Sequence, residues 1–514
     1  MECAREAALY YKCFIVYAPV FPSGTFFVLE YLPMKIAVFA SEVAPFSKTG
    51  GLADVTGALP RFLTEQGFEV KVFTPLYREV RQKGFPLLKT VDRLTFDWAG
   101  QIETFSLYET AGGETSTYFI DKPALFDREC VYGTPSGGEY PDNGTRFGFF
   151  SKASLEALKA LAFAPDVLHV HDWQASLALA YLKFVYADDP FFKSVKSLLT
   201  IHNLGYQGLF DPLILPEVGL PQKLYNMEDL EFYGKVNFLK AGILYASALN
   251  TVSYRYSLEI QTPEFGCGLD SLLRRRSDVL TGILNGIDYA IWNPANDSNL
   301  AAPYTSHDLA GKAACKADLL KAFGLPLSKK DIPLIGMVSR LAGQKGLDLL
   351  EESLARLFTL GLQLVILGMG EEKIQRALET ARARYPSFFG LTIAFDDALA
   401  HKVTAGSDMF LIPSRYEPCG LTQMSALKYG TIPVVRATGG LDDSIREFNP
   451  EDGQGNGFRF EEYSKEALSS AVRKALRTYG QKTLRAKLVQ NAMACDFSWN
   501  RSAQEYALLY KSIV

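Results

Sequence analysis

The sequence predicts an α/β protein of two doubly wound domains that face each other across a cleft. At 514 residues the chain is too long for one hydrophobic core. From residue 34 onward, short apolar runs typical of buried parallel strands alternate with helical stretches. An irregular stretch at 282–294, GILNGIDYAIWNP, separates two such series. Open sheets of this kind bind ligands beside the carboxyl ends of their strands.

Ten apolar runs are the expected strands. The first series comprises residues 35–40, 69–75, 166–171, 197–202 and 248–253. The second series comprises residues 334–339, 362–368, 391–395, 409–413 and 432–437. Helices are expected between successive strands of each series, as parallel pairing requires.

The composition excludes several classes of protein. A net charge of −4 and a pI near 5.9 give no reason to expect a nucleic-acid or membrane partner. The seven cysteines are scattered without a CxxC pair, which favours a reducing compartment and argues against structural zinc. With only five histidines as well, no metal centre is expected.

Residues 1–33 are treated separately. The uncharged run at 13–29 is interrupted by Pro19, Pro22 and Gly24, so a membrane span is not expected. The leader MECAREAALYYK has mixed charge, so a secretory signal is only the lesser alternative. The leader is not rich in Ser and Arg, as a plastid transit peptide would be. We expect a dispensable extension, or a start codon assigned upstream of Met34.

A Lys-Gly-Gly turn follows the first strand. Lys48, Gly50 and Gly51 open a helix, where backbone N–H groups and the helix dipole favour an anion and lysine adds a mobile charge. The turn matches neither GxGxxG nor GxxxxGK[ST], so a capped turn with a solvated lysine is the alternative. A second such turn, Thr438-Gly439-Gly440, follows the strand at 432–437, and we expect it to face the first across the cleft.

Charged side chains follow two further strands of the second series. Arg340 and Lys345, after the strand at 334–339, are placed to clamp a diphosphate, although solvated cations are commoner. Glu417, after the strand at 409–413, is placed to hold sugar hydroxyls or a developing positive charge, or else to bind free helix amides.

Histidines end two strands of the first series. In HVHDWQ at 169–174 the two rings point to one face of the strand, but no acidic or cysteine cluster accompanies them as a metal site would need. His171 is therefore expected to meet a polar ligand. The chain lacks GxSxG, HExxH and the carboxylate pair of a retaining glycosidase, so the pattern indicates a site that binds a phosphorylated donor and stabilises its leaving group.

Taken together, these motifs resemble the bacterial glycogen synthase and plant starch synthase family, retaining glucosyltransferases that use ADP-glucose. The resembling segments span residues 34–514 and include KTGGLAD, YPDNGTRF, HVHDWQ, TIHNLGYQG, GILNGID, VSRLAGQKGLDL, PSRYEPCGLTQMSALKYGTIPVV and ATGGLDD. The resemblance implies the GT-B fold. We expect an N-terminal Rossmann-like domain over 34–280, a C-terminal nucleotide-sugar domain over 281–496, and a helix over 497–514 that returns to the first domain.

The resemblance also implies a role for each motif residue. It assigns catalytic roles to Glu417, Arg340, Lys345, His171 and Asp142. It assigns donor binding to Lys48, Gly50, Gly51, Asp54, Asn285, Phe395, Thr438, Gly439 and Gly440, with Phe395 beside the adenine. The implied reaction transfers glucose from ADP-glucose to the non-reducing end of an α-1,4-glucan, with no cofactor and no metal, by front-face attack.

Two alternatives and several unknowns stay open. Many related transferases carry a second glutamate eight positions after the first; here that position is Ser425, which favours ADP-glucose over UDP-glucose. A transferase using UDP-glucose or a small acceptor, and a silent glucan-binding scaffold, are the alternatives; a phosphorylase is disfavoured. The expected location is the bacterial cytosol, or the plastid stroma in a plant or alga. The motifs predict neither whether the product is glycogen or starch, nor the oligomeric state, nor allosteric control.

Overall fold

The structure is a computed structural model, and it describes residues 33–112, 115–135 and 137–514. The expected extension over 1–33 lies outside this range apart from residue 33. Within these residues no helix is long and apolar enough to cross a bilayer.

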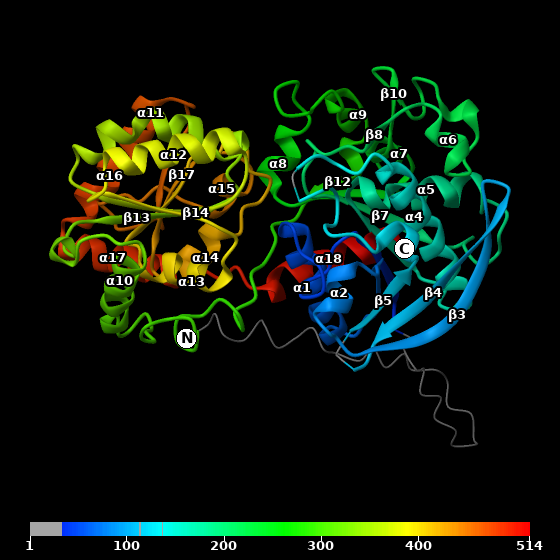
Figure 1. Cartoon of the computed structure of the whole chain (residues 1–514), viewed down its shortest axis with the longest axis horizontal. Coiled ribbons are helices and arrows are strands. Elements are labelled where there is room, and N and C mark those ends of the chain that lie inside the picture. Colours follow the sequence, from blue (N-terminus) through cyan, green and yellow to red (C-terminus); the bar gives the residue numbers. More distant parts are fainter. Residues whose placement is uncertain (1–32, 113–114, 136) are drawn as a thin grey trace, which may run out of the picture. The chain divides into compact units, whose positions relative to one another are not determined.

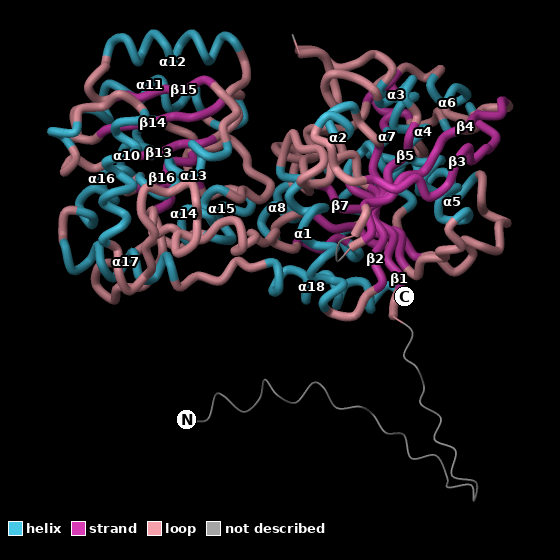
Figure 2. The backbone as a smooth tube through the Cα atoms, turned by 60° about the horizontal axis from the view of Figure 1, so that its bottom comes forward, coloured by secondary structure: helices cyan, strands magenta, loops and turns pink. Residues whose placement is uncertain are grey.

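A nine-stranded sheet forms the N-terminal lobe, with strand order β12-β11-β7-β6-β1-β2-β5-β4-β3. β4 is antiparallel to both of its neighbours, and the other pairs are parallel. Figure 2 shows these strands as one twisted band. The strands are β1 (Lys35–Phe39), β2 (Glu69–Pro75), β3 (Leu87–Trp98), β4 (Gln101–Thr110), β5 (Ser116–Asp121), β6 (Val167–His171), β7 (Lys196–Ile201), β11 (Ala248–Thr251) and β12 (Leu280–Gly282).

Five of the nine strands of this sheet were expected and are confirmed, whereas β5, the short β12 and the antiparallel hairpin β3–β4 were not predicted. Its strands carry many exposed polar residues, so they lack the continuous apolar run that marks a buried parallel strand. The local signal lies in the turn, where Ala99 and Gly100 both have positive φ, as a two-residue type I′ hairpin turn requires.

Helices cover both faces of this sheet because its central strands are apolar on both sides. In β1, Ile36 and Val38 belong to one core cluster while Ala37 and Phe39 belong to the other. The helices of the lobe are α1 (Gly51–Glu65), α2 (Arg78–Gln82), α3 (Pro123–Phe126), α4 (Asn143–Ala160), α5 (Asp172–Phe184), α6 (Ile214–Glu217), α7 (Phe238–Tyr245), α8 (Tyr254–Glu259) and α9 (Asp270–Arg275), with 3₁₀ turns η1 (Gln222–Leu224) and η2 (Ser277–Val279). A small antiparallel sheet joins β8 (Leu209–Phe210), β10 (Lys235–Asn237) and β9 (Glu231–Phe232).

A six-stranded, wholly parallel sheet forms the C-terminal lobe, in the order β15-β14-β13-β16-β17-β18. Its strands are β13 (Leu334–Val338), β14 (Gln363–Gly368), β15 (Phe389–Ile393), β16 (Met409–Ile412), β17 (Ile432–Arg436) and β18 (Phe458–Phe460). The five predicted strands are confirmed, with β15 displaced two residues towards the N-terminus. The short β18 was not predicted.

Helices lie on both faces of this second sheet, which makes it doubly wound (Figure 1). They are α10 (Ala310–Ala322), α11 (Leu347–Phe358), α12 (Glu372–Arg384), α13 (Asp397–Gly406), α14 (Thr422–Lys428), α15 (Gly439–Ser444), α16 (Lys465–Tyr479) and α17 (Lys482–Met493), with 3₁₀ turns η3 (Leu327–Lys329) and η4 (Gly343–Lys345). The two-domain α/β architecture expected from the sequence is confirmed.

The chain passes between the lobes twice, and the two passages touch. Ile287 N–H donates a 2.8 Å hydrogen bond to Phe497 C=O, where the outgoing and returning segments pair. After the return, α18 (Trp499–Ile513) packs on α1 and contributes Trp499 to the core below β1. The expected division after residue 280 falls inside β12, whose three residues all belong to the N-terminal sheet.

Candidate active site

The first Gly-Gly turn contains a buried carboxylate that sequence reasoning missed. Glu42, which is 3% exposed, accepts hydrogen bonds from the N–H of Thr49 and, at 3.2 Å, from that of Gly50. The hydroxyls of Thr49 and Tyr132 donate to its other oxygen at 2.7 and 2.5 Å. Burial raises the pKa of Glu42, although these hydrogen bonds oppose the shift. The amide of Gly50 is therefore engaged by the protein itself.

Lys48 reaches the first turn of the helix that it precedes. Its Nζ lies 2.7 Å from Asp54 Oδ1, and both side chains remain about one-third exposed. Partial burial raises the pKa of Asp54, and Lys48 opposes that rise. A partly exposed pair of this kind is weak enough to exchange partners, so Lys48 is able to turn towards an anion.

The first turn approaches the C-terminal lobe at Leu421. A Cβ placed on Gly51 would lie 3.7 Å from Leu421 Cδ1. Leu421 stands four residues after Glu417, in the loop between β16 and α14. The two lobes thus bring the Lys48–Gly51 turn and the Glu417 loop together, and the partner of the first Gly-Gly turn is this loop.

Glu417 and Lys345 form the centre of the C-terminal part of the site. Lys345 Nζ donates to Glu417 Oε2 at 2.6 Å, and Ser414 Oγ donates to the same oxygen at 2.9 Å. The side chain of Lys345 is only 17% exposed and that of Glu417 only 9%. The pair forms because β13 and β16 are neighbours, so their carboxyl ends deliver both loops to one edge of the sheet.

The loop that carries Lys345 needs a glycine next to it. Gly346 has φ +71°, and a Cβ there would lie 2.0 Å from Pro413 C=O. Gln344 C=O accepts from Arg415 N–H at 2.8 Å, which ties the two loops together. Arg340 is exposed and its Nη1 contacts Tyr206 Oη of the N-terminal lobe at 3.2 Å.

The second Gly-Gly turn already holds an anion of the protein. Glu259, at the end of α8 in the N-terminal lobe, accepts from Gly439 N–H at 3.1 Å to each oxygen. Thr438 Oγ1 donates to the same two oxygens at 3.3 and 3.2 Å. Gly440 N–H is bonded to the carbonyls of Glu417 and Pro418 at 3.1 and 3.2 Å. A diphosphate that used this turn would have to displace Glu259.

His171 ends β6 and is buried in a stack of imidazoles. Its Nδ1 is 2.9 Å from His202 Nε2, and its ring centroid is 4.1 Å from that of His169, which confirms that the His-x-His rings share one face. Burial holds the pKa of His171 well below its ordinary value. Its Nε2 is buried and, among the described residues, has no hydrogen-bonding partner.

The remaining predicted residues have different surroundings. Asn285 is 4% exposed, and its Oδ1 meets no donor within the residues that the structure describes. Asp142 precedes α4 and receives both Nη atoms of Arg128, at 2.9 and 2.5 Å. Phe395, two residues beyond β15, is 74% exposed. No group of three His, Cys, Asp or Glu side chains in the described ranges has the arrangement of a metal site.

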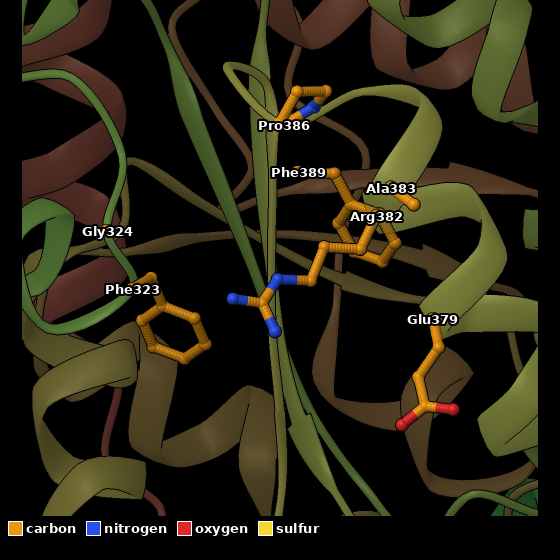
Figure 3. Close-up of a pocket in the computed structure, with 7 residues that line it drawn as sticks. All are labelled: Phe323, Gly324, Glu379, Arg382, Ala383, Pro386 and Phe389. Carbon is orange, nitrogen blue, oxygen red and sulfur yellow. The ribbon is translucent and has the colours of Figure 1, made fainter.

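The hollow in Figure 3 lies apart from these residues. It measures about 490 Å³ and is lined by residues of α12 and β15 and of the loops that follow α10 and α12. The Arg382 side chain extends towards Phe323 across it. It contains none of the predicted site residues.

Two carboxylates of the site, Glu42 and Glu259, escaped the sequence interpretation. Glu42 carried a usable signal, since it stands three residues beyond β1, at the carboxyl end of a buried strand. Glu259 carried none, because it ends a six-residue helix and meets Gly439 only through the tertiary fold.

Comparison with known proteins agrees with this geometry. Residues 35–275 match the family model described as "Starch synthase catalytic domain", and residues 323–494 match "Glycosyl transferases group 1". The chain is 49% identical to the glycogen synthase of Koribacter versatilis over 482 residues, which is 93% of this chain and 98% of that protein. It is 47% identical to the glycogen synthase of Syntrophotalea carbinolica over 94% of this chain and 99% of the relative.

A solved structure matches over nearly the whole chain. The catalytic domain of starch synthase IV from Arabidopsis thaliana, bound to ADP and acarbose, superposes with a TM-score of 0.87 at 33% identity. The match covers 94% of this chain and 99% of that one.

Proposed function

This chain belongs to the glycogen and starch synthase family of GT-B glucosyltransferases, and we propose that it transfers glucose from ADP-glucose to the non-reducing end of an α-1,4-glucan with retention of configuration. The family assignment makes it a glycosyltransferase. The donor nucleotide, the acceptor and the residue roles below are the proposal.

One observation carries the proposal. The loop that holds Lys48 in the N-terminal lobe lies against the loop that holds Glu417 in the C-terminal lobe, and Lys345 is bonded to Glu417; all three residues follow the carboxyl ends of parallel strands. Gly51 lies beside Leu421. A nucleotide-sugar diphosphate carries negative charge next to a neutral sugar. Cations from both lobes beside one buried carboxylate match that charge pattern.

The cations act on the leaving group. As the bond between glucose C1 and the diphosphate oxygen breaks, negative charge grows on ADP and positive charge on the sugar. Lys48, Arg340 and Lys345 stabilise the first charge, and the carboxylate of Glu417 stabilises the second. In front-face attack the departing phosphate oxygen accepts the proton of the acceptor hydroxyl, while that hydroxyl forms the new bond to C1.

Two unsatisfied polar atoms support a sugar subsite. His171 Nε2 and Asn285 Oδ1 are both buried and unpartnered among the described residues. Buried polar atoms are costly without hydrogen bonds, and sugar hydroxyls supply both donors and acceptors. We assign these two residues to the donor glucose, Phe395 to the adenine and Asp142, steadied by Arg128, to the region of the acceptor hydroxyl.

Lys48 and the amide of Gly51 are assigned to the diphosphate from the N-terminal lobe. Gly50 shapes the turn while its own amide stays on Glu42, and Asp54 releases Lys48 when the anion arrives. The Thr438–Gly440 turn is assigned to support of the Glu417 backbone, since Glu259 holds its polar groups.

We propose that no metal ion or cofactor takes part, because three cations are positioned to neutralise the diphosphate. The test is activity in excess EDTA and after addition of Mg²⁺. We expect the same rate in both conditions, and a rate that EDTA abolishes and Mg²⁺ restores would contradict the proposal.

The decisive experiment compares ADP-glucose and UDP-glucose, both labelled in glucose, with glycogen as acceptor. We expect label in the polymer from ADP-glucose, release of that label by α-amylase, and much slower transfer from UDP-glucose. Faster transfer from UDP-glucose would reassign the donor. No polymer from either donor would overturn the proposed function and leave a glucan-binding protein, which retention on a glycogen column would reveal. We propose the bacterial cytosol as the location, because the relatives reported above are bacterial glycogen synthases, with the plastid stroma as the alternative for a plant or algal source.

A further inference from the structure

We propose that Glu259 is a positioning residue of the transfer reaction: from the N-terminal lobe it holds the Thr438–Gly439 turn and, through that turn, the backbone that carries Glu417. The inference rests on the proposed function only for its kinetic consequence. The contacts themselves belong to the fold.

Glu259 is bound as a buried anion must be. Its side chain is 7% exposed, and its two oxygens share the Gly439 N–H and the Thr438 hydroxyl at 3.1–3.3 Å. Arg255 Nε, one helical turn earlier, lies 3.2 Å from Oε1. Charge-assisted hydrogen bonds are stronger than neutral ones, and an unpaired carboxylate here would be costly. Glu259 therefore stays on this turn.

The turn lies directly against the backbone of Glu417. Gly440 N–H donates to the carbonyls of Glu417 and Pro418. A Cβ on Gly439 would lie 2.0 Å from the Glu417 carbonyl oxygen, so the two backbones are in contact. Gly439 also has φ +45°, a conformation that glycine adopts without strain. Any shift of the turn consequently moves the carbonyl of Glu417.

The N-terminal end of α8 is hydrogen-bonded to the loop that carries Glu417 and Pro418. Ser253, the N-cap of α8, donates its hydroxyl to Pro418 C=O at 2.5 Å. Arg255 N–H donates to Asp443 Oδ2 at 2.8 Å. One short helix of the N-terminal lobe thus holds the Glu417–Pro418 backbone directly through Ser253 and indirectly through Glu259.

Small displacements matter at this position. The Glu417 carboxylate meets Lys345 at 2.6 Å, and reactions that depend on aligned charges lose much rate when such groups move by about 1 Å. Glu259 reaches no reacting atom in this arrangement. It acts by keeping the loop of the C-terminal lobe in register with α8 of the other lobe.

The test compares Glu259→Gln with Glu264→Gln, a substitution at an exposed glutamate five residues later. Loss of the charge-assisted bonds predicts a fall in kcat of about 10- to 100-fold in Glu259→Gln, with the KM for ADP-glucose nearly unchanged. Calorimetric titration with ADP counts intact sites, and we expect the same number per chain in both variants. Thr438→Val, which removes only the hydroxyl, should lower kcat in the same direction by less.

Three results would overturn the inference. An unchanged kcat in Glu259→Gln would show that the contact has no role in the reaction. A lower KM would show that Glu259 competes with the donor for the turn. A loss of rate that matches a loss of ADP sites would show a purely structural role.

Hydrogen–deuterium exchange separates this inference from the proposed function. In Glu259→Gln, the peptides that cover 414–420 and 437–444 should exchange faster than in Glu264→Gln. This readout needs no substrate, so it holds even if the wild-type enzyme transfers no glucose. Equal exchange in the two variants would refute the positioning contact whatever the reaction is.

Discussion

Lys345 Nζ lies 2.6 Å from Glu417 Oε2, although the two residues are 72 positions apart in the chain. Neighbouring parallel strands β13 and β16 bring them together, and Ser414 Oγ binds the same carboxylate oxygen. The pair therefore joins the residue assigned to the leaving diphosphate to the residue assigned to the glucose.

Replacing Glu417 should slow the transfer step more than it weakens donor binding. Loss of a preorganised charge at the reacting centre typically costs about 10²- to 10³-fold in rate. We therefore expect Glu417→Gln to lower kcat by about that factor with a small change in KM, measured by steady-state kinetics. Glu462→Gln, at an exposed glutamate of the same lobe, is the control. Wild-type kinetics in Glu417→Gln would remove Glu417 from the site.

Replacing Lys48 should weaken donor binding. Its ion pair with Asp54 is about one-third exposed, so the loss of this pair affects stability little. Loss of a charged contact to the diphosphate, worth about 1.5–3 kcal/mol, predicts a KM for ADP-glucose about 10- to 100-fold higher in Lys48→Ala. Lys48→Arg should recover part of this loss, and Lys330→Ala, on the surface, should change nothing. A normal KM in Lys48→Ala would assign the diphosphate to the C-terminal lobe alone.

The buried histidines of the N-terminal lobe should make its stability depend on pH. Burial lowers the pKa of His169 and of His202 to about 3, and that of His171 well below 6.5. The unfolded chain binds a proton at each histidine near pH 6.5, so acidification below that pH favours unfolding. Burial raises the pKa of Asp172 to about 7, so the folded carboxyl holds a proton that the unfolded one releases above about pH 4. Three protons taken up and one released leave about two.

The measurement is proton uptake on unfolding at pH 5.5, followed with a pH-stat. These four groups should contribute about two protons, equivalent to a loss of about 2.7 kcal/mol of stability per pH unit between roughly pH 6 and 4.5. His202→Asn should lower the uptake by about one proton, whereas His307→Gln, at an exposed histidine, should not. Equal uptake in His202→Asn and the wild type would mean that His202 is already protonated in the folded state.

The returning helix α18 should be essential to the stability of the N-terminal lobe. Trp499 is 1% exposed and packs in the core below β1, so Trp499→Ala leaves a cavity that should cost about 3–5 kcal/mol. Leu508, on the same helix, is 69% exposed, and Leu508→Ala should stay within about 0.5 kcal/mol of the wild type. Urea unfolding of both variants provides the comparison. A similar small loss in both would show that α18 docks without contributing to the lobe.

Much of the fold could be predicted from the sequence, because parallel strands that are buried on both faces need continuous runs of apolar residues. Runs such as KIAVFA and LQLVILG show this pattern directly, and the strands that they predict are confirmed. The hairpin β3–β4 could not be predicted by the same criterion, because its polar, solvent-facing residues resemble those of loops. The local sequence signal of this hairpin is the Ala99-Gly100 turn, where both residues have positive φ.

The sequence predicted those site residues whose charged side chains directly follow a predicted strand. Lys345 and Glu417 were predicted to share a cleft because each follows a strand of one parallel sheet, and the structure joins them. The partners of the two Gly-Gly turns were not predictable in this way. The first turn lies beside Leu421, and the second holds Glu259.

By itself, the sequence determined the two alternating series of strands and helices, the strand ends that carry Lys48, Lys345 and Glu417, and the family. Only the tertiary structure decided that Glu42 occupies the amide of Gly50 and that Glu259 occupies that of Gly439. Strand and helix patterns arise from neighbours within a few residues. A buried carboxylate instead takes whichever donors the packed lobes place within about 3 Å, because in a low-dielectric interior it cannot remain unpaired.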